Sequence, residues 1–278
     1  MNAPRHPNLT HWAERVELAA ALRWTARLNL HEAVANHFSL ATNADGTRFL
    51  VNPNRRHFAR VRASDLVEVD ANDPDTLSRP GAPDATAWGL HGALHRRVPH
   101  ARCAMHVHSP FATVLACLED PRLPPLDQNA CMFYGRQAID TNYGGLAFEE
   151  EGARCAELLS DPGLWVLIMG NHGVMVIGET VGQTFDRLYY FERAAETYIR
   201  ALQTGQPLRI LSDEVAAKTA ADLVGEPSGG AAHLAELTIL VGDAPLPLVE
   251  GLLGGIEHPL LGVHRFELLI DDVLALGK

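Results

Sequence analysis

The sequence predicts an α/β protein, because segments with apolar residues at helical spacing alternate with short runs rich in β-forming residues. The length of 278 residues allows one large domain or two small ones, and the hydrophobic content of 47% is enough to fill a core. No internal repeat is visible in the chain. A compact α/β fold is therefore expected rather than a solenoid or propeller.

Caps and breakers delimit the elements of the first part of the chain. An amphipathic helix is expected over residues 10–28. Three strand candidates follow, each bounded by Asn, Asp, Gly or Pro, at residues 38–41, 48–51 and 66–69. A stretch rich in helix breakers at 72–83 leads to a helix that Asp84 could cap and that runs to Val98.

A buried strand and a new helix are expected next. Residues 101–107 are mostly apolar and fit a buried strand. Ser109 suits the N-cap of the helix that follows, and Pro110 suits its first position. An irregular middle comes after this helix.

The later part of the chain contains a clear turn and a clear helix. Strand-like runs at 164–169 and 174–177 flank Gly170-Asn171-His172-Gly173, which predicts a hairpin or bent strand with His172 at its apex. A helix is expected over 181–204, because Thr180 and Gln183 make a capping box and Gly205 can end it.

Composition limits the classes of partner. The net charge of −11 gives no electrostatic footprint for nucleic acid or an anionic membrane, so a small-molecule substrate is expected. The first twelve residues lack the apolar segment of a signal peptide, and no run of about eighteen apolar residues occurs. The four cysteines include no CxxC pair, as is usual in a reducing compartment. These observations favour a cytoplasmic protein.

A His-x-His motif points to a metal site. Side chains on a strand alternate between faces, so His106 and His108 should project the same way. His172 is the natural third ligand, because the flanking glycines let the backbone approach another element. Three imidazoles would leave coordination positions free for water or substrate, as in a catalytic site. With fourteen histidines in the chain, however, an isolated His-x-His can also arise by chance.

Several segments, taken in order over residues 18–208, make the sequence resemble the class II aldolase/adducin family. They are Asn36-His37-Phe38-Ser39, Phe49-Leu50-Val51-Asn52-Pro53, Ala63-Ser64-Asp65-Leu66-Val67, Leu90-His91, His106-Val107-His108-Ser109 and Asn171-His172-Gly173. The resemblance implies a three-layer α/β/α fold with a mostly antiparallel central sheet. It also implies homo-oligomers, often tetramers, with the active site near a subunit interface.

The resemblance further implies a chemistry. Family enzymes cleave or form a carbon-carbon bond next to a carbonyl or hydroxyl, through an enolate held by one divalent Zn, Mn or Co ion. The three metal-binding histidines of the family match His106, His108 and His172. Asp84 and Tyr134 are the candidate catalytic acids, and the candidate substrate contacts are His37, Ser39, Arg55, Arg56, His57 and His91.

The chain departs from the family aldolases where they hold a catalytic glutamate and substrate phosphate. Ala87 stands four residues before His91, where those aldolases have the glutamate that shuttles protons, and Ala85 and Thr86 replace the two preceding serines. The other phosphate loop is altered within Asn52-Pro53-Asn54-Arg55-Arg56. A retro-aldol step without a positioned base would lose roughly a hundredfold to ten-thousandfold in rate.

These losses favour decarboxylation, because a carboxylate leaves already ionised and needs no base. Arg55 and Arg56 could bind a substrate carboxylate, although a solvated basic turn explains them equally well. The pattern resembles the adducin-like branch, which includes decarboxylases of hydroxylated aromatic acids such as a pyridine-dicarboxylate decarboxylase. The leading hypothesis is therefore a metal-dependent decarboxylase of a small hydroxyaromatic or hydroxy/keto acid.

Two alternatives stay open at this point. One is an aldolase in which Asp84 or Tyr134 supplies the acid, although Asp84 also suits a helix cap and Tyr134 also suits simple packing. The other is a non-enzymatic interaction module like adducin itself. The family-like domain is expected to span residues 1–237, and the tail 238–278 carries no motif that we can interpret.

Overall fold

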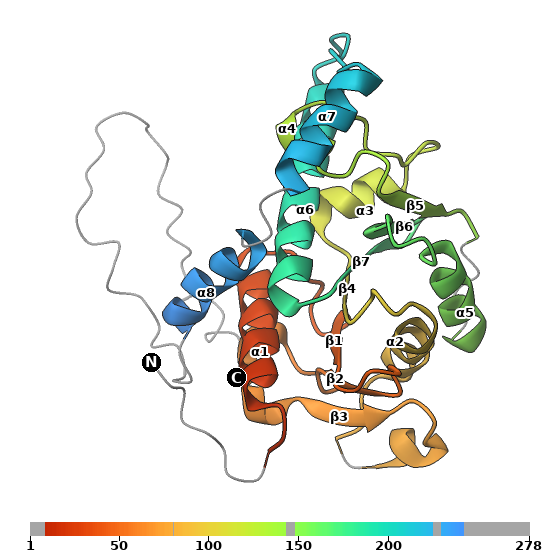
Figure 1. Ribbon diagram of the computed structural model, residues 1–278, viewed down its shortest axis with the longest axis vertical. Coiled ribbons are helices and arrows are strands. Elements are labelled where there is room, and N and C mark those ends of the chain that lie inside the picture. Colours follow the sequence, from red (N-terminus) through yellow and green to blue (C-terminus); the bar gives the residue numbers. More distant parts are fainter. Residues whose placement is uncertain (1–8, 80, 143–147, 225–228, 242–278) are drawn as a thin grey trace, which may run out of the picture. The chain divides into compact units, whose positions relative to one another are not determined.

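We describe a computed structural model of the chain, which covers residues 9–79, 81–142, 148–224 and 229–241 (Figure 1). Its centre is a seven-stranded sheet with the order β3-β2-β1-β4-β7-β6-β5. The strands are β1 (His37–Ala41), β2 (Arg48–Val51), β3 (Val67–Asp70), β4 (Cys103–Val107), β5 (Gln137–Asp140), β6 (Val166–Met169) and β7 (Gly173–Gly178). All neighbouring strands pair antiparallel except β5 and β6. The sheet is thus mostly antiparallel, as expected.

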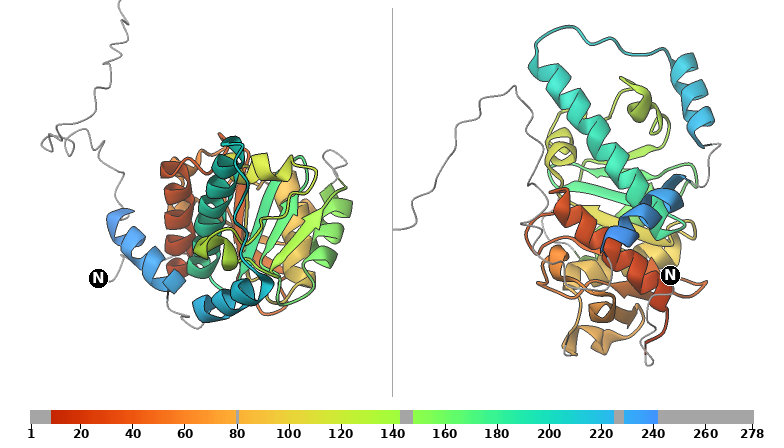
Figure 2. Two further views of the ribbon diagram at one scale, coloured as in Figure 1. Left: turned by 90° about the horizontal axis from the view of Figure 1, so that it is seen from above. Right: turned by 90° about the vertical axis from the view of Figure 1, so that its left-hand side faces the viewer.

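Helices cover both faces of this sheet. The view from above in Figure 2 shows α1 (Trp12–Arg27) and α6 (Val181–Gln203) on one side and α5 (Phe148–Leu158) on the other. α2 (Ala85–Arg97) packs beside α5. The remaining helices are α3 (Pro110–Ala116), α4 (Gln128–Cys131), α7 (Asp213–Val224) and α8 (Gly229–Val241). The fold is a three-layer α/β/α arrangement, so the predicted class is confirmed.

Strand alternation divides the core into two layers. Cys103, Met105 and Val107 of β4 belong to the apolar cluster under α1 and α6. Ala104, on the opposite face, joins the cluster formed with α2 and α5. The same alternation places His106 on the α2 and α5 face. Its neighbour across the β1–β4 pair is His37.

Most predicted elements are present, with boundaries shifted by at most two residues. The third strand is Val67–Asp70, and the breaker-rich stretch contains a short 3-10 helix, Pro74–Ser78. Two further 3-10 turns, Phe58–Arg60 and Ala63–Asp65, lie between β2 and β3. The irregular middle was incompletely predicted, because it contains α4, β5 and α5.

The expected domain boundary at 237/238 falls inside a helix. α8 continues to Val241, and residues 242–278 of the expected tail lie outside the described residues. Leu234 is buried in the main core, and the Trp24 indole donates to the carbonyl of Leu237 at 2.9 Å. The part of α8 that carries Leu234 and Leu237 therefore packs on the main core. In the described residues, no helix is long and apolar enough to cross a membrane.

Candidate metal centre

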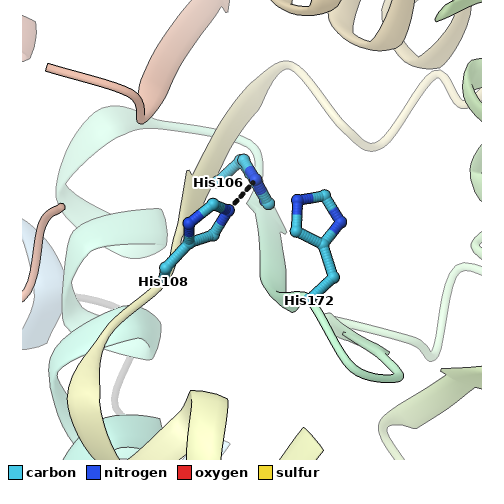
Figure 3. A group of neighbouring side chains, drawn as sticks. All are labelled: His106, His108 and His172. Carbon is cyan, nitrogen blue, oxygen red and sulfur yellow. Dashed lines mark hydrogen bonds between the residues drawn. The ribbon is translucent and has the colours of Figure 1, made fainter. Parts of the chain in front are cut away.

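The three predicted ligand histidines come together at the ends of adjacent strands (Figure 3). His106 lies in β4, His108 directly follows that strand, and His172 lies in the turn between β6 and β7. Their ring centroids are 4.8 to 4.9 Å apart in all three pairs. One ring nitrogen from each lies within 4.8 Å of the others, which is a spacing that a single ion can bridge.

The turn that carries His172 requires a close backbone approach. A Cβ on Gly173 would lie 2.5 Å from the carbonyl oxygen of Val107 and 2.9 Å from Cδ2 of His108. Asn171 has a φ of 58°, in the left-handed region, and its N–H donates to the carbonyl of Ala116 at 2.9 Å. The glycine seen in the sequence is thus what lets the turn reach β4.

Groups outside the cluster orient the rings. Nδ1 of His106 donates to the carbonyl oxygen of Val174 at 3.0 Å, and Nδ1 of His108 donates to the carboxylate of Glu32 at 2.6 Å. Nδ1 of His172 lies 3.7 Å from the carboxylate of Glu151. The hydrogen bonds of His106 and His108 fix the tautomers of these two rings and leave their Nε2 atoms for the ion.

The two Nε2 atoms of His106 and His108 lie only 3.1 Å apart. Each ring donates from Nδ1, so in the neutral state both Nε2 atoms present lone pairs and no proton lies between them. Two nitrogen ligands of a tetrahedral zinc ion are about 3.3 Å apart, given Zn–N bonds of about 2.05 Å. A bound cation would satisfy both lone pairs, so the residues present fit a metal ion.

Burial keeps the rings of His106 and His172 neutral. Desolvation lowers the pKa of His106 well below its usual value, and the neighbouring histidines lower it further. Desolvation also lowers the pKa of His172 to about 4, with a further contribution from His108. Neutral imidazole is the form that binds metal, because the ligand nitrogen must carry a lone pair.

A buried carboxylate holds the chain immediately after His108. Glu192 of α6 is 3% exposed and accepts hydrogen bonds from Ser109 Oγ at 2.6 Å, Phe111 N at 2.8 Å and Ala112 N at 2.9 Å. Ser109 occupies the predicted N-cap position of α3, but its side chain accepts no capping bond. The capping acceptor is Glu192 instead, because its carboxylate reaches two N–H groups of the first turn.

Beside the cluster, a chain of hydrogen bonds connects β1 to α2. Nδ1 of His37 bonds to Nε2 of His91 at 2.7 Å, and the other ring nitrogen of His91 bonds to Ser39 Oγ. Ser39 also bonds to Nε2 of His95 at 2.7 Å. Ser39 and His91 are fully buried, so neither side chain is placed for the direct substrate contact expected from the sequence. His37 is adjacent to His106, with ring centroids 4.9 Å apart.

In the loop that carries Arg55 and Arg56, one of the two arginine side chains already has a partner. Arg56 forms an ion pair with Asp65 at 3.2 Å, whereas Arg55 is exposed and has a φ of 55°. The exposed His57 contacts His31, with 3.0 Å between their Nε2 atoms. Of the two guanidinium groups, that of Arg55 is therefore the more available to a ligand.

Of the remaining residues singled out in the sequence, two have structural roles and one lines a pocket away from the histidines. Asp84 caps α2 by accepting from the N–H of Thr86 at 2.9 Å, as predicted. Ala87 is 1% exposed and packs with Phe49 in an apolar cluster. Tyr134 lines a hollow of about 480 Å³ together with residues that do not include the three histidines. Within one chain, the structure does not bring Tyr134 to the cluster.

Sequence reasoning missed the carboxylates around the site. Glu32, Glu151 and Glu192 act from segments distant in the chain, and each resembles an ordinary charged residue of a solvated surface. His95 was also missed, although its i+4 spacing from His91 places both on one helix face.

Comparison with known proteins agrees with this geometry. The family profile of the Class II Aldolase and Adducin N-terminal domain matches residues 16–199. The chain belongs to this family. Both the predicted resemblance and the fold that it implied are confirmed.

Individual relatives share the family domain at moderate identity. A Streptomyces roseochromogenus protein named 4-hydroxy-3-prenylphenylpyruvate oxygenase/4-hydroxy-3-prenylbenzoate synthase is 28% identical over 64% of this chain and 66% of its own length. Decarboxylase NovR of Streptomyces niveus is 26% identical over 79% of this chain and 74% of its own. The crystal structure of an aldolase II superfamily protein from Pseudomonas syringae matches with a TM-score of 0.73 and 27% identity, covering 84% of this chain and 94% of that one.

Proposed function

We propose that the protein is a metal-dependent carbon-carbon lyase that decarboxylates a small hydroxyaromatic or hydroxy/keto acid. His106, His108 and His172 would hold one divalent Zn, Mn or Co ion through Nε2. The observation that carries the proposal is the convergence of one ring nitrogen from each of these histidines, with the Nδ1 atoms of His106 and His108 engaged by outer partners. Three imidazoles accept several first-row ions, so the identity of the ion depends on its supply.

A bound divalent ion would supply Lewis acidity toward a substrate oxygen. The bond between the substrate carbon and its carboxylate then breaks, carbon dioxide leaves, and the electron pair stays on the substrate. A proton adds to that carbon afterwards. Ala87 supports this order of events, because an apolar residue packed against Phe49 cannot act as the proton shuttle of an aldolase.

Positive charge in the loop after β2 supports a carboxylated ligand. Arg55 is exposed in the loop after β2, and a guanidinium binds a carboxylate through two parallel hydrogen bonds. Arg56 would act indirectly, since its ion pair with Asp65 holds the same loop. The name of one relative, a decarboxylase, supports the reaction, and the name of another, a prenylbenzoate synthase, supports an aromatic acid as the substrate class.

Carbon dioxide release tests the reaction. The purified chain is stripped with a chelator, reloaded with Zn, Mn or Co, and incubated with a panel of hydroxybenzoates, hydroxypyridine carboxylates and keto acids. We expect metal-dependent release from at least one of them, both with and without dioxygen. Turnover of a phosphorylated ketose alone would overturn the proposal in favour of an aldolase. Release that requires dioxygen would indicate an oxygenase instead.

Metal content tests the site itself. We expect about one ion per chain in the wild type and in His100→Ala, a control at a histidine outside the cluster, and loss of the ion in His106→Ala and His172→Ala. Glu32→Gln should weaken binding by about 10- to 100-fold, as is typical when an outer partner of a histidine ligand is changed. A metal content of only a small fraction of one ion per chain, unchanged in the cluster variants, would favour a non-enzymatic adducin-like module. The expected tetramer, with its active site near a subunit interface, stays a prediction that light scattering and a structure of the assembly test.

A further inference from the structure

A chain of four polar side chains runs from the edge of the metal centre into the protein and ends at a backbone carbonyl. It begins at His37, passes through His91, Ser39 and His95, and ends where Nδ1 of His95 meets the carbonyl oxygen of Ala101 at 2.7 Å. The proposed decarboxylation assigns no task to its three inner members. We refer to Ser39, His91 and His95 as the relay.

The carbonyl of Ala101 fixes the donor and the acceptor of every hydrogen bond between it and His37. A carbonyl only accepts, so His95 carries its proton on Nδ1, and in the neutral ring its Nε2 accepts from the hydroxyl of Ser39. The oxygen of Ser39 is then free to accept from Nδ1 of His91. Nε2 of His91 accepts in turn from Nδ1 of His37. It follows that His37 carries its proton on Nδ1 and has an unprotonated Nε2.

This assignment requires neutral rings, and burial provides them. His91 and His95 are 0% and 4% exposed. Desolvation lowers the pKa of His95 to about 4 and lowers the pKa of His91 well below its usual value. His37 is buried as well, at 4% exposed. A charged ring in this layer would lack the solvation or counter-charge that it needs.

We propose that the relay is a positioning device that keeps the Nε2 lone pair of His37 available to the ligand at the metal centre. Within the described part of the chain, the hydrogen bond of the His37 ring is made through Nδ1, and the ring lies against the ring of His106. A ligand that offers a hydrogen-bond donor there, such as the protonated hydroxyl of a hydroxy acid, is therefore preferred. This inference names the substrate feature that the site selects, and so it rests on the proposed function.

Ser39 is the residue at which the relay can be broken without touching His37. Its hydroxyl both accepts from His91 and donates to His95, and alanine does neither. In Ser39→Ala, the carbonyl of Ala101 no longer determines the tautomer of His91. The pair of His91 and His37 can then reverse, so that His37 carries its proton on Nε2.

A matched pair of variants at His95 separates the relay from packing. His95→Gln retains a side-chain acceptor for Ser39, whereas His95→Leu fills a similar space with no acceptor. We expect His95→Gln to keep the wild-type tautomer of His37 and His95→Leu to lose it. Equal effects of the two variants would contradict the relay and indicate a packing role.

Nitrogen-15 solid-state NMR of the zinc-loaded protein labelled at histidine reads the tautomer directly. The signals of His37 are assigned by their absence in His37→Gln. We expect protonated Nδ1 and unprotonated Nε2 in the wild type, and the reverse in Ser39→Ala. A protonated Nε2 in the wild type, or an unchanged tautomer in Ser39→Ala, overturns the inference.

Ligand competition tests the selection. The zinc-loaded protein is titrated with 2-hydroxybenzoate and 2-methoxybenzoate, in which a methyl group replaces the donor hydrogen at that position. We expect the wild type to prefer the hydroxyl by about tenfold or more, because an acceptor facing a ligand without a donor loses a hydrogen bond, and Ser39→Ala to lose most of that preference with unchanged zinc content. An equal preference in both proteins overturns the selection. If neither acid nor any acid of the wider panel binds, the proposed function fails, whereas the NMR result still decides whether the relay exists.

Discussion

Glu192 offers the sharpest test of how the fold supports the centre. Its carboxylate accepts from Ser109, Phe111 and Ala112, and thereby fixes the residues that directly follow His108. Glu192→Gln preserves the length of the side chain but replaces one oxygen with a donor. A buried amide group then faces at least one N–H or O–H that also donates.

The size of the effect follows from the arrangement of these bonds. Oε2 of Glu192 receives two of them, from Ser109 and Ala112, and Oε1 receives the third, from Phe111. The smallest loss leaves only the N–H of Phe111 unpaired and weakens the other two bonds. Hydrogen bonds to charged groups contribute about 1.5–3 kcal/mol each, so we expect Glu192→Gln to lower the free energy of unfolding by about 2–4 kcal/mol.

Urea denaturation followed by circular dichroism measures this difference. With a slope near 3 kcal/mol per molar, the midpoint should fall by about 1 M. Glu196→Gln is the matched control, because Glu196 lies one turn further along the same helix and pairs with the exposed Arg193 and Arg200 at 2.8 Å. The control should change stability by about 0.5 kcal/mol or less. If both variants shift the midpoint equally, the reasoning about Glu192 is refuted.

Three further predictions concern the turn, the helix and the buried histidines. Gly173→Ala places a Cβ 2.9 Å from Cδ2 of His108, so we expect a loss of about 1–3 kcal/mol together with a lower zinc content, measured by denaturation and elemental analysis. Ala87→Glu should lower stability by about 2 kcal/mol or more at pH 7 without creating aldolase activity, because its carboxylate would be buried next to Phe49; a stable variant that cleaves a ketose phosphate would contradict this. Burial holds the pKa of His95 at about 4 in the folded state, below its unfolded value, so the unfolded state binds the proton first and stability falls as the pH drops from 6.5 toward 4. Between pH 7.5 and pH 5 this histidine alone should cost about 2 kcal/mol, and the loss should be smaller in His95→Gln.

The sequence predicted an element correctly where a capping residue or a turn marked its ends. The helix Val181–Gln203 begins after Thr180, which accepts from Gln183 N at 3.1 Å, and it ends before Gly205, whose φ is 67°. In the expected capping box, Gln183 reaches back to the N–H of Glu179 rather than to that of Thr180. The hairpin with His172 at its apex also matches the prediction.

Other parts of the structure depend on contacts that no local pattern reveals. β5 has four residues and little alternation, and α5 begins within a run of glutamates, so neither has a strong apolar period. The relay and His37 are only weakly indicated by the sequence. His37 and Ser39 are two residues apart on a strand, and His91 and His95 are four residues apart on a helix. Only the packing of α2 on β1 shows that these two pairs face each other.

The metal-binding residues and the residues that would select the ligand lie on different elements of the fold, which affects how such proteins can diversify. The three histidines come from β4 and the β6–β7 turn, whereas the groups that would distinguish ligands come from β1, α2 and the loop after β2. Mutations in the second set leave the first intact. A library confined to α2 and that loop could therefore be screened for new reactions while every member retains the same ion-binding frame.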